Sequence, residues 1–285
     1  YFFHLVLIIS GRTCDFPEMN DLNNNTKLFA LFRVFFNCRF YYPIYLVMFL
    51  DFGLTISEFA TLNLIWAIAI ILLEVPSGAL ADHVGRKRLI ILSSILMIGE
   101  ISVLIFTPIG SPIVFWMFVI NRILSGAAEA AASGADEALA YDSIPINNRE
   151  AIWKKTMKRV MIMVSVGFVI SSIIGALVYS TDFINSIASA LNFETEFTKK
   201  QTVKFPLYLN FGSALIVFFI ACKFEEDHKI SMGGKIIAIK ESFAGTLRAG
   251  QWILKSPAAS CLILIGLFYD SIIRVFYQGW RARTF

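Results

Sequence analysis

The chain has 285 residues, of which 57% are hydrophobic and only 16% are charged. Soluble domains usually carry about 25% charged residues, so this composition excludes an ordinary soluble enzyme. It also excludes a disordered chain, which lacks apolar side chains to bury. The net charge of +4 is small and collects in particular loops, whereas a nucleic-acid-binding protein concentrates basic residues on one face of a polar domain. We therefore expect a membrane protein with no nucleic-acid partner.

Apolar stretches long enough to cross a bilayer recur along the chain. A spanning helix needs about 20 mostly apolar residues. Seven stretches are close to that length, with approximate bounds 29–50, 58–79, 89–107, 112–135, 160–180, 205–222 and 257–278. The opening run, residues 1–9, is too short to span and is interpreted with the rest of residues 1–28 as an N-terminal segment. The sequence thus predicts an all-α membrane protein embedded in the lipid bilayer.

Lys and Arg residues collect on one side of these spans. The loops after spans two and four and the linker before span seven hold thirteen of them, namely Arg86, Lys87, Arg88, Arg149, Lys154, Lys155, Lys158, Arg159, Lys229, Lys235, Lys240, Arg248 and Lys255. The alternate loops hold three, Lys199, Lys200 and Lys204. Because basic residues mark cytoplasmic loops, we expect a multi-pass protein of the cell membrane with its N-terminus in the cytoplasm.

Motifs of enzyme or metal chemistry are scarce. The four cysteines, Cys14, Cys38, Cys222 and Cys261, are scattered and do not show the spacing of a metal site. Neither Gly-x-Ser-x-Gly nor His-Glu-x-x-His occurs, although hydrolases and metalloproteases depend on such motifs. We therefore expect no metal, no cofactor and no catalytic residue, and a membrane-embedded enzyme is kept as an alternative.

The most specific pattern lies between spans two and three. Its key residues are Gly78, Asp82, Gly85, Arg86, Lys87 and Arg88. Small residues let membrane helices approach closely and glycine permits tight turns, so we expect Gly78 to contact a neighbouring helix and Gly85 to form the turn. Asp82 is placed to pair with Arg86 or to cap a facing helix N-terminus. A generic cytoplasmic turn explains the basic triplet but not the glycine and aspartate spacing.

This spacing resembles the signature loop of the major facilitator superfamily, which reads Gly, three residues, Asp, two residues, Gly, Arg and further basic residues. Arg122 to Gly126 is similar to that family's Arg-x-x-x-Gly motif, and Glu74 to Gly78 is similar to many bacterial-type permeases. The resemblance covers about residues 29–278. It implies a six-helix bundle over 29–223, a cytoplasmic amphipathic linker over 224–256, and a seventh helix over 257–285 that begins a second bundle.

The chain departs from the family pattern in three respects. Span five lacks the Gly-Pro of the drug:proton antiport motif. The loop 181–204 is longer than is usual in the family, and the sequence predicts no function for it. The family usually has twelve spans, so we expect this sequence to be an incomplete chain, a first half plus one helix, that does not transport by itself.

Ionisable side chains inside membrane spans are costly and mark functional positions. At about 1.5 Å per residue, four of them are expected near the midplane, where transporter sites lie: Arg39, Glu100, Arg122 and Asp270. Glu100 and Arg122 occupy consecutive antiparallel spans at matching depth, so we expect them to pair. The spacing of seven residues places Arg122, Glu129 and Asp136 on one face of span four, a face suited to carry a proton or an ion-pair switch.

The resemblance also implies roles for some of these residues. Arg122 is expected to take part in energy coupling. Asp136 is expected to interact with Asp82 and Arg86 in a cytoplasmic charge relay that stabilises one conformation. Asp142 is the less favoured partner because it is predicted to lie beyond the membrane.

Other charged residues allow two interpretations. Arg33, near the start of span one, is expected to extend to the inner headgroups. Arg39 is suited equally to contacting a substrate anion and to a structural pair with an acid. Glu74 is suited equally to a structural role and to gating.

Together these features predict a secondary active transporter, a permease or efflux protein, that moves a small solute by alternating access. The expected coupling ion is a proton or another ion, and the full-length protein is expected to be a monomer. A non-transporting sensor or scaffold is the other alternative, which the midplane charges disfavour.

Overall fold

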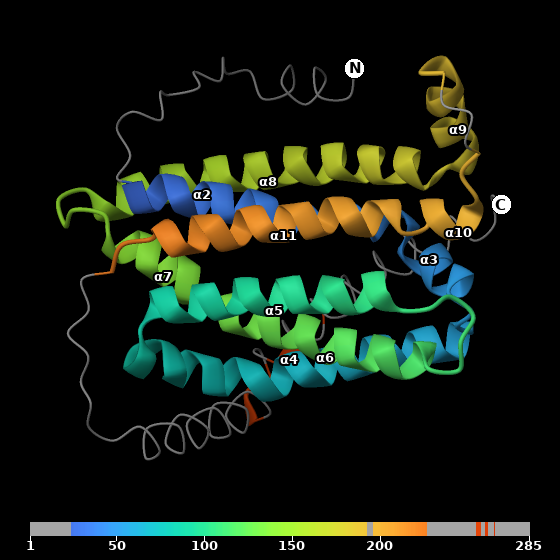
Figure 1. The fold of residues 1–285 in the computed structure, drawn as a ribbon. Coiled ribbons are helices and arrows are strands. Elements are labelled where there is room, and N and C mark those ends of the chain that lie inside the picture. Colours follow the sequence, from blue (N-terminus) through green and yellow to red (C-terminus); the bar gives the residue numbers. More distant parts are fainter. Residues whose placement is uncertain (1–23, 193–195, 227–254, 258–259, 262–264, 266–285) are drawn as a thin grey trace.

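The computed structural model describes residues 24–192, 196–226, 255–257, 260–261 and 265. The elements in this part are helices, and the long ones lie side by side with roughly parallel axes (Figure 1). Within the described residues, five segments are long and apolar enough to cross a membrane: Ile56–Gly78, Arg86–Phe106, Val114–Asp142, Arg149–Tyr179 and Lys199–Lys223. Nearly all of the predicted linker and seventh span, Asp270 included, and residues 1–23 of the predicted N-terminal segment lie outside the described residues.

The helices form two groups around a shared interior. Their bounds are α2 Asn24–Asn37, η2 Tyr42–Ile44, α3 Tyr45–Asp51, α4 Ile56–Val84, α5 Arg86–Phe106, α6 Val114–Ala132, α7 Ala135–Asp142, α8 Arg149–Tyr179, α9 Thr181–Ala190, α10 Lys199–Thr202 and α11 Phe205–Lys223. Figure 1 shows α4, α5 and α6 on one side and α2, α8 and α11 on the other, and contacts of α11 with α5 join the two groups.

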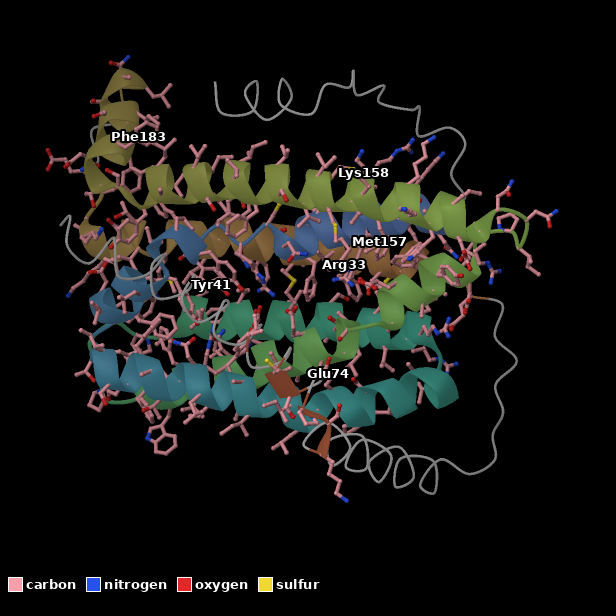
Figure 2. The ribbon with its side chains drawn as sticks, turned by 180° about the vertical axis from the view of Figure 1, so that it is seen from behind. Arg33, Tyr41, Glu74, Met157, Lys158 and Phe183 are labelled. Atoms are coloured by element: carbon pink, nitrogen blue, oxygen red, sulfur yellow. The ribbon has the colours of Figure 1, made fainter. Side chains whose placement is uncertain are left out.

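The two ends of the bundle differ in charge. The end that holds Arg86–Arg88 and the start of α8 is called the basic end here. The end that holds residues 51–55, 107–113, 180–192 and 196–204 is called the opposite end. Figure 2 shows Lys158 on the basic half of α8 and Phe183 on α9 beyond its other end.

The first predicted span is not one helix, contrary to the expectation for residues 29–50. The chain leaves α2 after Asn37 and resumes at η2 and α3. Pro43 explains the interruption, because a proline ring clashes with the carbonyl four residues earlier in a helix, here that of Arg39. The Arg39 carbonyl instead accepts the N–H of Tyr42 at 3.1 Å. The break places Arg39 inside the bundle, where it is buried.

Local sequence explains where the other helices begin and end. Thr55 and Glu58 form a capping box at the start of α4, where the Glu58 N–H donates to the Thr55 hydroxyl at 3.2 Å. Gly85 has a φ of +104° and alone separates α4 from α5, which confirms the predicted turn. Gly134, at φ +74°, separates α6 from α7. These two positive φ values favour glycine.

Two apolar clusters fill the interior, one toward each end. The cluster toward the basic end includes Phe32, Phe36 and Met97. The other includes Tyr41, Ile101 and Phe118. Arg39 lies between Phe36 and Tyr41 in the sequence, and Glu100 lies between Met97 and Ile101. The buried charges therefore occupy a layer between the two apolar clusters.

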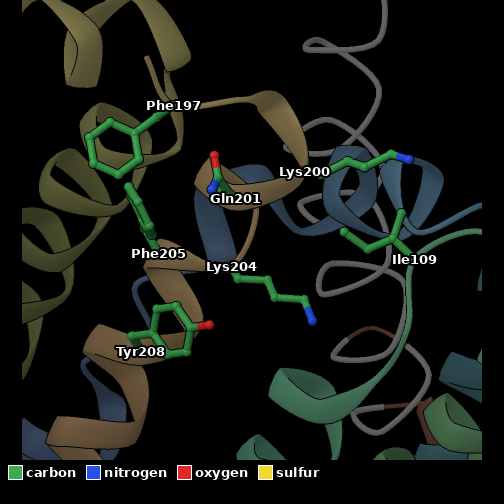
Figure 3. Close-up of a pocket in the computed structure, with 7 residues that line it drawn as sticks. All are labelled: Ile109, Phe197, Lys200, Gln201, Lys204, Phe205 and Tyr208. Carbon is green, nitrogen blue, oxygen red and sulfur yellow. The ribbon is translucent and has the colours of Figure 1, made fainter. Parts of the chain in front are cut away.

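At the opposite end a lysine binds the end of α5, and a cavity lies beside it. Lys204 donates through Nζ to the carbonyls of Ile105 and Thr107 at 2.7 and 3.1 Å, so its charge satisfies carbonyls at the C-terminus of α5. A cavity of about 420 Å³ opens beside it, with Lys200 and Tyr208 also in its lining (Figure 3). This cavity lies apart from the buried layer of charges.

Candidate functional site

Arg39 and Glu100 form an ion pair inside the bundle. Arg39 Nη1 donates to Glu100 Oε1, and the exposed fractions of the two side chains are only 5% and 0%. The Arg39 guanidinium also lies over the Phe36 ring, 5.4 Å from its centroid. Two charges taken out of water are stable only when they are paired and hydrogen-bonded. Of the two interpretations of Arg39, the structure supports the pair with an acid.

Arg122 lies beside this pair but does not join it. Its Nε and Nη2 donate to Asn121 Oδ1 at 2.8 and 2.5 Å, and its Nη1 donates to the Tyr45 hydroxyl. Its guanidinium lies 5.4 and 5.6 Å from the ring centroids of Tyr45 and Phe49. None of the ion pairs among the described residues includes Arg122. Arg122 is therefore a buried cation held by neutral groups.

The predicted pairing of Glu100 with Arg122 is wrong, although the two residues do lie at similar depth. The side chain of Asn121 donates to the Glu100 carbonyl at 2.7 Å, which places these two levels of α5 and α6 together. The break in the first span places Arg39 against the Glu100 carboxylate, so Arg39 and not Arg122 is its partner. The sequence signal that was missed is Pro43, which makes that break.

Two polar residues of α11 bind the chain around the break in the first span, and a glycine of α8 makes room for it. Asn210 Oδ1 accepts the Phe40 N–H at 3.0 Å, which satisfies a backbone donor that the interrupted helix leaves free. Ser213 donates to the Phe35 carbonyl at 2.7 Å. Gly175 leaves room on the other side, since a Cβ there would lie 1.7 Å from the Phe40 oxygen. Sequence reasoning overlooked Asn210, a buried amide within an apolar span.

The buried layer retains polar atoms without hydrogen-bond partners. In the described part of the chain, Glu100 Oε2 and Asn210 Nδ2 are buried and make no hydrogen bond. Each costs free energy when it is left unpaired in an apolar environment. The layer therefore has unused capacity for one acceptor and one donor bond.

Span four is divided, so the predicted common face of Arg122, Glu129 and Asp136 is wrong. α6 ends at Ala132, and Asp136 lies on α7 beyond the left-handed turn at Gly134. The heptad spacing therefore does not carry through from Arg122 to Asp136. Glu129 is on α6 and exposed.

Asp136 pairs with Arg33 and not with Arg86. Arg33 Nε lies 2.5 Å from Asp136 Oδ2, and its Nη2 donates to Asp136 Oδ1 at 3.0 Å and to Glu137 Oε1 at 2.7 Å. Figure 2 shows Arg33 within the bundle, next to Met157 of α8. The expectation that Arg33 extends to the headgroups is therefore wrong, because two carboxylates of α7 hold it.

At the basic end, Arg86 pairs with Asp142, the partner that the sequence argument disfavoured. Arg86 Nη1 donates to Asp142 Oδ2, and Arg149 Nη1 lies 3.9 Å from Asp142 Oδ1. The predicted relay between Arg86 and Asp136 is therefore wrong. Its physical reason is the turn at Gly134, which sends Asp136 toward α2 and carries Asp142 to the signature loop.

Glu226, which the sequence analysis did not consider, completes this end. Its two carboxylate oxygens accept the N–H groups of Arg86 and Lys87 at 2.8 and 3.0 Å, so it caps the N-terminus of α5. A Cβ at Gly85 would lie 2.9 Å from Glu226 Oε2, so a larger residue there would displace the capping carboxylate. A carboxylate just after an apolar span was the signal available.

Other loop predictions have mixed outcomes. The side chain of Asp82 lies outside the described part, and Arg88 is exposed. Among the described residues, no heavy atom lies within 4 Å of a Cβ built at Gly78, so the helices described here do not make the predicted close approach. Gly126 makes one instead, since a Cβ there would lie 2.8 Å from Ala69 Cβ and 3.1 Å from the Trp66 carbonyl.

Comparison with known families agrees with this arrangement. The model of the Major Facilitator Superfamily matches residues 28–278. The chain belongs to the Major Facilitator Superfamily. Its membership makes it a multi-pass membrane protein of a family of secondary transporters of small solutes and not of enzymes. No match was found among the curated proteins.

Proposed function

We propose that this superfamily member couples the movement of a small solute to protons by alternating access, with Arg122 as the coupling residue. Arg122 carries the proposal because it is a buried cation on a membrane helix that only neutral groups hold. An ionisable group in that position is functional by default. A mobile counter-charge is needed at this level during at least part of the cycle.

The neighbouring pair supplies the group that exchanges a proton. Glu100 holds Arg39 while it is ionised. The Asn121 side chain connects this level to Arg122, because its Nδ2 donates to the Glu100 carbonyl and its Oδ1 accepts from Arg122. Protonation of Glu100 would remove the negative charge that neutralises Arg39. The layer would then carry two cations, which favours entry of an anion or a rearrangement of the helices.

We further propose that the basic end faces the cytoplasm in the cell membrane. The basic loops and the anionic inner leaflet support this orientation. Impermeant thiol labelling tests it in intact cells, with cysteine placed at Asn147 or Ser57 in a background without native cysteines. We expect Ser57→Cys to react from outside and Asn147→Cys to react only after the cells are opened; the reverse pattern would reject the orientation.

The coupling proposal is tested with the full-length protein in proteoliposomes that contain the pH dye pyranine. Sugars, amino acids, organic acids and organic cations are added in turn, and solute-dependent proton movement is recorded. We expect at least one solute class to move protons and Arg122→Ala to abolish that signal while the helix content is unchanged. Lys155→Ala is the control, because Lys155 is an exposed cation near the start of α8. Normal proton movement in Arg122→Ala would refute the role.

A further inference from the structure

The segment after α8 contains a short helix whose position differs from that of every long helix. α9, Thr181–Ala190, is separated from the end of α8 by one residue, Ser180, which is its N-cap. Figure 1 shows it lying crosswise to the long helices and projecting from the end of α8, away from the rest of the bundle. The long helices cross the membrane, so α9 runs along the membrane surface at the opposite end.

The side chains of α9 are sorted into separate faces. At about 100° per residue, Phe183, Ile187 and Leu191 fall within one arc, and their exposed fractions are 37%, 42% and 63%. The polar residues Asp182, Ser186 and Ser189 occupy another exposed arc. An exposed apolar face beside an exposed polar face is typical of a helix at a membrane interface.

The remaining face of α9 is fixed to the protein. Asn185 accepts the Phe197 N–H at 2.8 Å and donates to the Phe197 carbonyl at 3.1 Å. The hydroxyls of Thr181 and Thr202 lie 3.0 Å apart, and Ala188 is buried. These contacts fix the rotation of α9 about its axis, so its apolar arc stays turned away from the bundle.

The surface next to α9 identifies what covers the apolar arc. On the last turns of α8, Val169, Ile170, Ile173 and Leu177 are exposed by 40% to 56%. This surface lies on a spanning helix and faces lipid tails. Because α9 projects from the end of the same helix, its exposed apolar residues continue the apolar surface of α8.

We propose that α9 is an interfacial helix whose Phe183, Ile187 and Leu191 insert into the lipid leaflet at the opposite end. Such helices bury their apolar face about 5–10 Å into the boundary between headgroups and acyl chains. The insertion anchors the end of α8 and, through Thr181 and Thr202, the start of α11 at a fixed depth. This gives a role to the unusually long segment 181–204 and does not depend on the direction or coupling of transport.

The first test measures lipid contact around the helix. A background with Cys14→Ser, Cys38→Ala, Cys222→Ser and Cys261→Ser carries one fluorescent NBD label, at Ile187→Cys or at the matched control Ser189→Cys. The two positions lie about 160° apart around the axis. Each protein is placed as a single copy in a phosphatidylcholine nanodisc, with Ile173→Cys as the lipid-exposed reference and Asn147→Cys as the aqueous reference.

The proposal predicts opposite quenching at the two positions. Doxyl-labelled lipid should quench the label at 187 several-fold more than the label at 189, and aqueous iodide should show the reverse order. Equal iodide quenching would place α9 in water and overturn the proposal. Shielding of position 187 from iodide without lipid quenching would place protein over the arc and would also overturn it.

A second measurement needs no cysteine replacement. p-Benzoyl-phenylalanine is placed at position 187 or 189 of the otherwise native chain in the same nanodiscs and is activated by light. Mass spectrometry should show phospholipid adducts at 187 and a several-fold lower yield at 189. Equal yields, or adducts with protein alone at 187, would refute lipid insertion.

Discussion

Two ion pairs of this transporter have the same chemistry and opposite surroundings. The Arg39–Glu100 pair is enclosed between two apolar clusters, and its side chains are 5% and 0% exposed. The Arg86–Asp142 pair lies at the basic end, where the exposed fractions are 27% and 54%. Water can replace either partner of the second pair but neither partner of the first. Removing one partner should therefore cost far more stability in the buried pair than in the exposed pair, and the exposed pair can break at little cost during a conformational cycle.

Removal of one partner of the buried pair should cause the largest decrease in the free energy of unfolding. Glu100→Ala leaves the Arg39 cation buried without a carboxylate. Breaking such a pair costs about 3–5 kcal/mol. We expect a decrease of that order in the free energy of unfolding, measured by circular dichroism during titration of detergent-solubilised protein with sodium dodecyl sulfate.

The double variant Arg39→Met, Glu100→Met separates charge from packing. Replacing both charges by apolar side chains of similar volume is often neutral or stabilising, so the double variant should recover most of the loss. A double variant as unstable as Glu100→Ala would show that shape rather than charge accounts for the effect. Proton-driven activity should stay absent in both variants, because neither retains the carboxylate.

The broken span should be the next most sensitive feature. In Gly175→Ala the new methyl group would lie 1.7 Å from the Phe40 oxygen, and a backbone atom cannot turn aside as a side chain does. Overpacking of this kind costs about 1–3 kcal/mol. Gly212→Ala on α11 is the matched control, since no described atom lies within 4 Å of a Cβ there.

The same titration tests this prediction. Gly175→Ala should lower the free energy of unfolding, whereas Gly212→Ala should leave it unchanged or raise it, since alanine is the better helix former. Equal effects of the two substitutions would show that α8 does not press on the break. The position of Arg39 would then need another support.

The break also shows where sequence reasoning reached its limit. Apolar length predicted α11 as residues 205–222, and the helix runs over Phe205–Lys223. The depth of a charge along a span follows from counting residues, so Glu100 and Arg122 were correctly placed at the same level. Depth does not fix the rotation of a helix about its axis. It also does not show whether a residue of another span, here Arg39, lies closer to Glu100 than Arg122 does. The partner of Glu100 therefore could not be obtained from spacing.

At the basic end the failure has a different cause. A heptad spacing keeps residues on one face only while the helix continues, and Gly134 stops it between Glu129 and Asp136. Gly85 was predicted correctly because a turn depends on its own residue. The cap supplied by Glu226 joins positions 140 residues apart, a distance over which local patterns carry no signal.

Removing the Glu226 cap should have an intermediate effect on stability, because its contacts to backbone N–H groups are only partly buried. Glu226→Gln removes the charge that faces two N–H groups of α5. Loss of a helix N-cap costs about 1 kcal/mol. Glu225→Gln is the matched control, because the bonds of Glu225 to Asn25 use its backbone N–H and carbonyl. An equal loss in both variants, in the same unfolding titration, would contradict the capping role.

The exposed pair should give the smallest change in stability. Arg86→Ala removes a contact to an Asp142 side chain that is half exposed, and surface pairs contribute about 0.2–1 kcal/mol. We therefore expect little change in the free energy of unfolding but a shift in conformation, seen as altered reactivity of a cysteine at Asn147. The exchanged pair Arg86→Asp, Asp142→Arg should restore the original reactivity if attraction between the two side chains holds this end closed. A loss of stability as large as that of Glu100→Ala would instead place this pair in a dry environment and would remove the distinction between the two regions.

Arg149 also lies near Asp142, at the longer distance of 3.9 Å. Arg149→Ala should therefore change the reactivity of the cysteine at position 147 less than Arg86→Ala does.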